Sequence, residues 1–121
     1  MSYDPQNIFA KILRGEIPCD KIYENGHALA FRDIHPKAPV HVLIIPKGAY
    51  VSSSDFSATA SPEEIAGFMR AIHAVAEQAG VLESGYRLIA NTGANGHQEV
   101  PHFHVHLLGG RPLGAMLQTG R

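Results

Sequence analysis

The feature that most constrains the fold is a row of three histidines near the C-terminus, in which polar and apolar side chains alternate. The row reads His102, Phe103, His104, Val105, His106, Leu107 and Leu108. A period of two is typical of a half-buried strand, because successive strand side chains point to opposite faces. Phe103, Val105 and Leu107 are therefore expected in the core, with the three histidines on one open face. Three large polar rings pack poorly together, so we expect this face to meet a ligand.

The length and composition are typical of one soluble globular domain. With 121 residues the chain can build one core but not comfortably two, so we expect a single domain over residues 1–121. Within it, residues 1–6 are expected to be a loose N-terminus and residues 111–121 a C-terminal tail. The formal net charge of −1 offers no overall attraction to nucleic acid, and we expect no nucleic-acid partner.

The single cysteine, Cys19, excludes an intramolecular disulfide and a thiolate metal cluster. No apolar run approaches the roughly 18 residues of a membrane helix, and we expect no signal peptide. We therefore expect a reducing, cytoplasmic setting and no membrane partner.

Hydrophobic periodicity predicts an antiparallel α+β domain with its helices packed on one face of a sheet. Residues 49–60, rich in Ser and Ala, are expected to form a long surface connection. The predicted elements, in chain order, are a helix over 7–14, strands over 21–24, 27–33 and 40–45, a second helix over 62–79, and strands over 86–91 and 102–108.

Three interpretations of the histidine row remain open: structural residues, a metal site, and a nucleophile with its supporting groups. Imidazoles on a strand can bind zinc, but Cα atoms two residues apart are separated by roughly 6.6 Å and the outer pair by about 13 Å. One extended strand cannot easily bring all three rings to one ion, and no carboxylate on a second strand is obviously placed. We expect neither a metal nor a cofactor.

The nucleophile interpretation fits the chemistry of imidazole. A neutral imidazole attacks phosphorus well, and the phospho-imidazole that results is labile enough for water to release it. One ring must then be held as a neutral tautomer with a free nitrogen, while its neighbours donate hydrogen bonds and move protons. His41, in an otherwise apolar strand, would be costly without a polar partner, and another imidazole would serve.

The row matches the His-φ-His-φ-His-φ-φ signature of the histidine-triad (HIT) family, where φ is apolar, and its context resembles the Hint branch of that family. The resemblance covers nearly the whole chain in order. The matching segments include Gly15–Pro18, Ala30–Ile34, Ala38–His41, Ile44–Lys47, Gly96–Glu99 and Leu107–Arg111.

This resemblance implies a HIT-like fold in which a five-stranded antiparallel sheet carries two helices. In a homodimer, two such sheets would join into one of ten strands. It also implies hydrolysis of the P–N bond of purine nucleoside 5′-phosphoramidates, including AMP-lysine amides, through a covalent nucleotidyl-histidine. The alternatives are a dinucleoside polyphosphate hydrolase, a nucleotide phosphorylase, and a non-catalytic protein that binds purine nucleoside monophosphates or serves as a scaffold.

The same resemblance assigns catalytic roles to four histidines. His104 matches the nucleophile, and His106 matches the ring that contacts the phosphate and the bridging atom. His102 and His41 match the supporting histidines that orient the others and relay protons.

Five further positions match nucleotide-binding residues of the family. Asp33 matches the carboxylate that holds the ribose hydroxyls, and Ile34 matches an apolar residue beside the base. The loop positions expected around the phosphate, together with His104 and His106, are Asn91, Gln98 and Glu99.

Three positions depart from the family pattern. His97 stands where a second glycine is usual, so either the loop conformation differs or the ring reaches the site. Glu99 replaces a serine common in eukaryotic members, and an ionised Glu cannot donate a hydrogen bond to a phosphate. Ala49 lies near the position of a further relay histidine in some members, so that part of the relay is absent.

Overall fold

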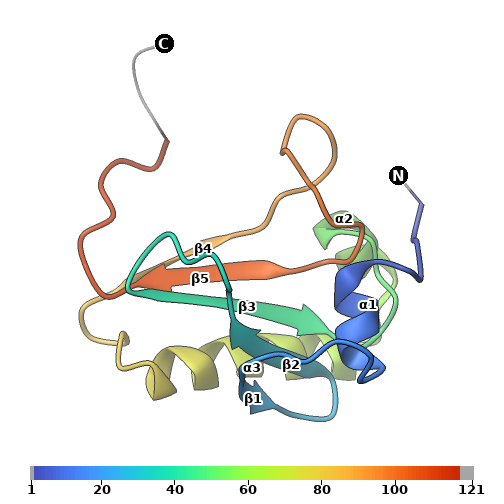
Figure 1. The fold of residues 1–121 in the computed structure, drawn as a ribbon, viewed down its shortest axis with the longest axis horizontal. Coiled ribbons are helices and arrows are strands. Elements are labelled where there is room, and N and C mark those ends of the chain that lie inside the picture. The colour runs from blue at the N-terminus through green and yellow to red at the C-terminus, as the bar shows by residue number, and fades with distance from the viewer. Residues whose placement is uncertain (1, 118–121) are drawn as a thin grey trace.

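The computed structural model describes residues 2–117, which form one five-stranded antiparallel sheet with helices on both of its faces (Figure 1). The strands follow the order β1-β2-β3-β5-β4, and each pairs with its neighbours in antiparallel fashion. The elements are α1 (Ile8–Leu13), β1 (Lys21–Glu24), β2 (Ala28–Arg32), β3 (Val40–Pro46), α2 (Ser53–Thr59), α3 (Pro62–Gln78), β4 (Tyr86–Ile89) and β5 (Val105–Gly109). The predicted α+β class and the five-stranded sheet are confirmed.

The long helix α3 begins at a capping box formed by Ser61 and Glu64. The Ser61 side chain accepts a hydrogen bond from the Glu64 backbone N–H, the Glu64 carboxylate accepts one from the Ser61 N–H, and Pro62 occupies the first turn. Figure 1 shows α3 running beneath the sheet. Its apolar stripe forms the main core with one face of β2, β3 and β5, and the buried residues include Phe68, Ile72, Val75, Ala30, Ile44 and Leu107.

The prediction that all helices pack on one face of the sheet was wrong. Phe9 of α1 packs against the opposite face, in a second core cluster with Leu29, Phe31, Leu43 and Ile45. The reason is that β2 and β3 are apolar at almost every position and are buried on both sides. Such strands are typical of a sheet that is covered on both faces.

The prediction of a connection without regular structure over residues 49–60, and hence of two helices in all, was also wrong. Residues Ser53–Thr59 form α2, whose N-cap Ser52 accepts a hydrogen bond from the Asp55 N–H. Phe56 is the only buried residue of this helix. A helix of two turns with one apolar anchor has no hydrophobic periodicity, which is the signal that identified the other helices.

The histidine row is only partly a strand. β5 begins at Val105, and the preceding residues continue the alternation in an irregular segment, where the Phe103 N–H donates to the Tyr50 carbonyl at 2.7 Å. Phe103, Val105 and Leu107 lie in the core as predicted. The prediction that all three histidines line an open face was wrong for His102, which is 0% exposed. The N-terminal residues and α1 cover this end of the sheet. The sequence of the histidine row alone could not predict that these distant residues would bury His102.

Both chain ends are held against the domain within the described residues. The Asn7 backbone N–H and side-chain amide both donate to the Asp4 carbonyl, and Arg14 donates to the Pro5 carbonyl, although residues 1–6 were expected to be loose. In the tail, Arg87 of β4 donates to the carbonyls of residues 114 and 115. Residues 118–121 of the expected tail lie outside the described part, and no helix within residues 2–117 is long and apolar enough to cross a membrane.

Candidate active site

A cleft of about 350 Å³ opens on the α1 side of the sheet and collects most of the predicted site residues. Its apolar wall includes Phe9 of α1, Phe31 of β2 and Leu43 of β3. Polar side chains also line the cleft, and the predicted site residues in its lining are Asp33, Ile34, Asn91, Glu99, His104 and His106. The cleft therefore offers an apolar surface beside a row of hydrogen-bonding groups, which is the usual composition of a small-molecule site.

His104 is held in one tautomer by the residue two positions before it. Its Nδ1 lies 2.8 Å from the His102 carbonyl oxygen, which can only accept, so Nδ1 carries the proton. Burial lowers the pKa of His104, and the ring is neutral at neutral pH. The lone pair is then on Nε2, the nitrogen a nucleophile would use.

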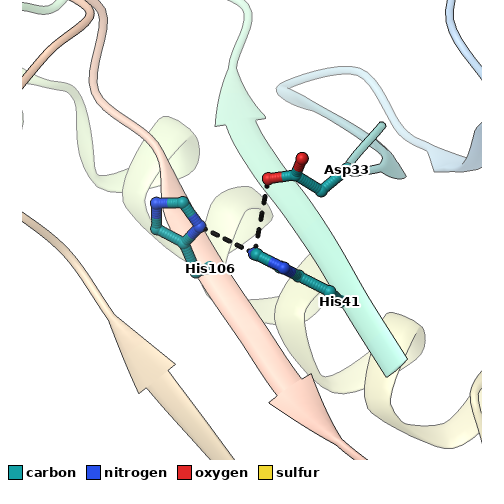
Figure 2. Close-up of side chains that lie close together, drawn as sticks. All are labelled: Asp33, His41 and His106. Carbon is teal, nitrogen blue, oxygen red and sulfur yellow. Dashed lines mark hydrogen bonds and ion pairs between the residues drawn. The ribbon is translucent and has the colours of Figure 1, made fainter. Parts of the chain in front are cut away.

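His41 and His106 form a hydrogen-bonded pair between β3 and β5 (Figure 2). The Lys37 backbone N–H donates to His41 Nδ1 at 3.0 Å, so the proton of the neutral His41 ring is on Nε2. That N–H donates to His106 Nδ1 at 2.9 Å, which leaves the remaining proton of His106 on its Nε2. The pair supplies the polar partner expected for His41, and each ring has a defined donor and acceptor side.

The site keeps these imidazoles neutral. Burial is the main cause that lowers the pKa of His106 to about 4, and the charges that His104 and His41 would carry lower it further. Burial also lowers the pKa of His41, and the nearby Asp33 carboxylate opposes this only in part. At neutral pH the site therefore offers one free imidazole lone pair and one imidazole N–H donor, with no fixed positive charge on the rings.

Asp33 follows β2, lies beside His41 and also lines the cleft. One carboxylate oxygen accepts from the His35 backbone N–H at 2.8 Å, and the other lies 3.4 Å from His41 Nε2 (Figure 2). The second distance is long for a strong hydrogen bond, so this oxygen retains capacity to accept from a bound molecule. Ile34, beside it, is 82% exposed at the lip of the cleft.

His102 does not line the cleft and supports it from behind. Its Nε2–H donates to the Pro46 carbonyl at 2.9 Å, and its own carbonyl accepts from His104. Burial lowers the pKa of His102, so this ring is neutral as well.

The loop between β4 and β5 brings some of the expected phosphate-side residues to the cleft and not others. Asn91 and Glu99 line it. The Gln98 carboxamide is instead buried in the loop, where its oxygen accepts from the Gly93 N–H and its nitrogen donates to the carbonyls of Val51 and Val100. Gln98 thus holds the shape of the loop.

The backbone conformation at His97 is one that favours glycine. It has a φ of +57°, a left-handed conformation that costs a residue with a Cβ about 1–2 kcal/mol. Its exposed ring lies at the mouth of the cleft, with Nε2 3.6 Å from a Glu99 oxygen. Of the two expectations for His97, the structure supports a ring that reaches the site.

The sequence interpretation missed two contributors to this site. Phe9 was expected only as part of a covering helix, yet its ring meets the His104 ring edge-on with centroids 4.9 Å apart. The Lys37 backbone N–H sets the tautomer of His41. A helix-face phenylalanine and a backbone amide carry no special signal in the sequence, so neither could have been identified there.

No carboxylate was expected on a second strand, but Asp33, which directly follows β2, lies beside two of the histidines. The ligand atoms of Asp33, His41 and His106 lie within 4.8 Å of one another. A metal at His41 Nε2 would require the ring proton on Nδ1, where it would face the Lys37 N–H. The hydrogen bonding of this donor set therefore fits a proton relay better than a metal site.

Comparisons with known proteins agree with the geometry. The HIT domain model matches residues 14–113. The chain is 52% identical to the purine nucleoside phosphoramidase of Escherichia coli (strain K12) over 113 residues, 93% of each chain, and 58% identical to an uncharacterised HIT-like protein of Azospirillum brasilense over 98% of each. A HIT family hydrolase from Clostridium thermocellum superimposes with a TM-score of 0.84 at 39% identity, covering 93% of this chain and 97% of that one.

A histidine-triad protein from Clostridium difficile superimposes with a TM-score of 0.82 at 37% identity, covering 96% of this chain and all of that one. The signature, the fold and these relatives lead to one assignment: the chain belongs to the HIT family, in its Hint-like branch.

Proposed function

We propose that this protein hydrolyses the P–N bond of purine nucleoside 5′-phosphoramidates through a covalent nucleotide bound to His104. The observation that carries the proposal is the tautomer of His104, whose Nδ1–H is held by the His102 carbonyl so that Nε2 is free to attack. The 52% identity to a purine nucleoside phosphoramidase supports the choice of substrate class.

The lining of the cleft supports one proposed orientation of a purine nucleoside 5′-phosphate. The base packs on the apolar wall beside Ile34, and Asp33 accepts hydrogen bonds from the ribose hydroxyls. The phosphate then lies next to Asn91 and His106. Glu99 lies near the departing amine, and Gln98 contributes by holding the loop.

The reaction proceeds in two displacements at phosphorus. His104 Nε2 attacks, the P–N bond breaks, and the departing nitrogen takes a proton from His106 Nε2–H. The hydrogen bond that His106 Nδ1 accepts from His41 stabilises the negative charge that develops on His106. Water then attacks phosphorus, releases the nucleotide from His104 and returns a proton to His106, so both rings end as they began.

Turnover assays with a nucleophile variant test the proposal. Adenosine 5′-phosphoramidate and a diadenosine polyphosphate are offered to the wild type, to His104→Ala and to His73→Ala, which removes a solvent-exposed histidine of α3. We expect the amide to be hydrolysed by the wild type and by His73→Ala but not by His104→Ala. Unchanged hydrolysis in His104→Ala would refute the assignment of the nucleophile.

The other functions give different patterns in the same assay. Preferred turnover of the diadenosine polyphosphate would favour a dinucleoside polyphosphate hydrolase. Binding of AMP, followed by calorimetry, without turnover of either compound would favour a nucleotide-binding or scaffold protein.

We further propose that the protein is a homodimer in which two β4 strands pair across a two-fold axis to give a ten-stranded sheet. β4 is an edge strand that exposes Tyr86 and Leu88, whereas the opposite edge, β1, carries the charged Lys21 and Glu24. Arg87 is the one charged residue of β4, and its guanidinium already donates to the carbonyls of residues 114 and 115. An exposed strand edge with large apolar side chains favours pairing with another chain. Light scattering should give the mass of a dimer for the wild type and of a monomer for Leu88→Asp; a monomeric wild type would contradict the proposal.

A further inference from the structure

Tyr3 lies in the irregular segment before α1 and reaches the back of the candidate active site. Its hydroxyl oxygen is 2.8 Å from His102 Nδ1, and the two rings are tilted by 58° with centroids 5.6 Å apart. The segment is held directly after this contact, because Asn7 donates to the Asp4 carbonyl and Arg14 to the Pro5 carbonyl. The contact joins residues 99 positions apart in the chain.

The direction of this hydrogen bond follows from the other side of the ring. His102 Nε2 lies 2.9 Å from the Pro46 carbonyl oxygen, which can only accept, so the ring proton is on Nε2. Nδ1 is therefore an acceptor, and the Tyr3 hydroxyl is its donor. His102 is fully buried, so loss of the hydroxyl would leave a buried acceptor without the donor that now satisfies it.

The residue that Tyr3 holds is also the residue that orients the nucleophile. The His102 carbonyl accepts the Nδ1–H of His104 at 2.8 Å, and Phe9 packs edge-on against both histidine rings. A fixed His102 ring therefore means a fixed backbone carbonyl, and a fixed carbonyl keeps the His104 proton on Nδ1. If the His102 carbonyl could move, the His104 ring could change its tautomer and its orientation.

We propose that Tyr3 is a positioning residue for the nucleophile: its hydroxyl locks the His102 ring, and with it the carbonyl that keeps His104 Nε2 free for attack. The proposal rests on the proposed function only in treating His104 as the nucleophile. Tyr3 is not among the residues that line the cleft, so its loss should affect the chemical step rather than nucleotide binding.

Tyr3→Phe is the direct test, because it keeps the ring that packs against His102 and removes only the hydroxyl. Tyr23→Phe is the matched control, since Tyr23 lies on β1 and packs against the core on the α3 side of the sheet. With adenosine 5′-phosphoramidate, we expect kcat of Tyr3→Phe to fall about fivefold, as for loss of one ordinary hydrogen bond. KM should stay within twofold of the wild type, and Tyr23→Phe should keep both constants within twofold.

NMR of protein labelled with ¹⁵N in its histidine rings gives a readout that does not depend on turnover. In the wild type we expect His102 with its proton on Nε2 and His104 with its proton on Nδ1. Tyr3→Phe should shift the His102 Nδ1 signal and give His104 a mixture of both tautomers. If the wild type fails to hydrolyse the amide, the proposed function fails, and the NMR result still decides the role of Tyr3.

Three outcomes would overturn the proposal. The first is a Tyr3→Phe variant whose kcat and ring signals equal those of Tyr23→Phe. The second is a fall in kcat with no change in the His104 tautomer, since the effect would then not pass through the carbonyl. The third is full activity in Tyr3→Phe together with loss of activity in Tyr3→Ala, which would assign the role to the packing of the ring instead of the hydroxyl.

Discussion

Substituting His106 with Gln should flatten the pH dependence of the free energy of unfolding. Burial, helped by His104 and His41, lowers the pKa of His106 from 6.5 to about 4. Below pH 6.5 the unfolded chain therefore binds a proton that the native protein does not, and stability is lost as the pH falls from about 6.5 toward about 4. Gln cannot titrate, and its amide oxygen can still accept the His41 Nε2–H.

The size of the effect follows from the displaced pKa. Each pKa unit is worth about 1.4 kcal/mol, so a drop from 6.5 to about 4 corresponds to at most about 3.5 kcal/mol at low pH. Between pH 7 and pH 5 this ring accounts for about 2 kcal/mol, and screening by water in the cleft reduces the figure to about 1–2 kcal/mol. The wild type should lose more than this in all, because burial also lowers the pKa of His41, His102 and His104.

Urea unfolding followed by circular dichroism at pH 7, 6 and 5 gives the required free energies, at one protein concentration so that any dimer contributes equally. The wild type and His73→Gln, which changes an exposed histidine of α3, should lose equal stability over this range. His106→Gln should lose about 1–2 kcal/mol less. A His106→Gln variant with the same pH dependence as the wild type would refute the claim that this ring is held neutral by the fold.

Three further tests address other parts of the structure. Gly67→Ala should lower the free energy of unfolding by about 1–3 kcal/mol, because the added Cβ would lie 2.6 Å from an atom of the His27 ring. The control Gly26→Ala adds a Cβ that meets nothing within 4 Å and should be close to neutral, so equal urea midpoints for the two variants would contradict the prediction. At the left-handed position 97, His97→Gly should be more stable than His97→Ala by about 1 kcal/mol, and equal stability in thermal unfolding would mean that the loop is not strained. Asp33→Asn keeps an acceptor for the His35 N–H but loses the charge, so KM for the nucleotide substrate should rise about tenfold with a smaller change in kcat; an unchanged KM would remove Asp33 from the ribose site.

The sheet could be predicted from the sequence because its main strands have local hydrophobic patterns. The apolar run at 40–45 became β3, and the second half of the alternation at 102–108 became β5. Between the first two predicted strands, the side-chain amide oxygen of Asn25 accepts from the N–H groups of residues 27 and 28. The cap at Ser61 likewise marked the start of α3. These are signals within a few residues of the feature they specify.

The parts that were missed depend on contacts between distant segments. α2 is anchored by Phe56 alone, and the burial of His102 depends on Tyr3 and Phe9, which are about a hundred residues away. The apolar character of β2 and β3 at successive positions is the one local sign that both faces of the sheet are covered.

The candidate site was predicted in its residues more fully than in its geometry. His41, His104 and His106 were placed together by resemblance, but their tautomers come from the Lys37 N–H and the His102 carbonyl, which are backbone groups that any sequence would supply. Gln98 was expected beside the phosphate, and its carboxamide is instead used within the loop. The sequence carries residue identity, and the fold decides which atoms of each residue remain free.

The central claim, a covalent nucleotide on His104, is tested most directly by the stereochemical course of hydrolysis at phosphorus. An adenosine 5′-phosphoramidothioate of one configuration at phosphorus is hydrolysed in ¹⁸O-labelled water, and the configuration of the product is determined. Two successive in-line displacements, first by His104 Nε2 and then by water, predict overall retention. Inversion would mean that water attacks the substrate directly, and it would contradict the account.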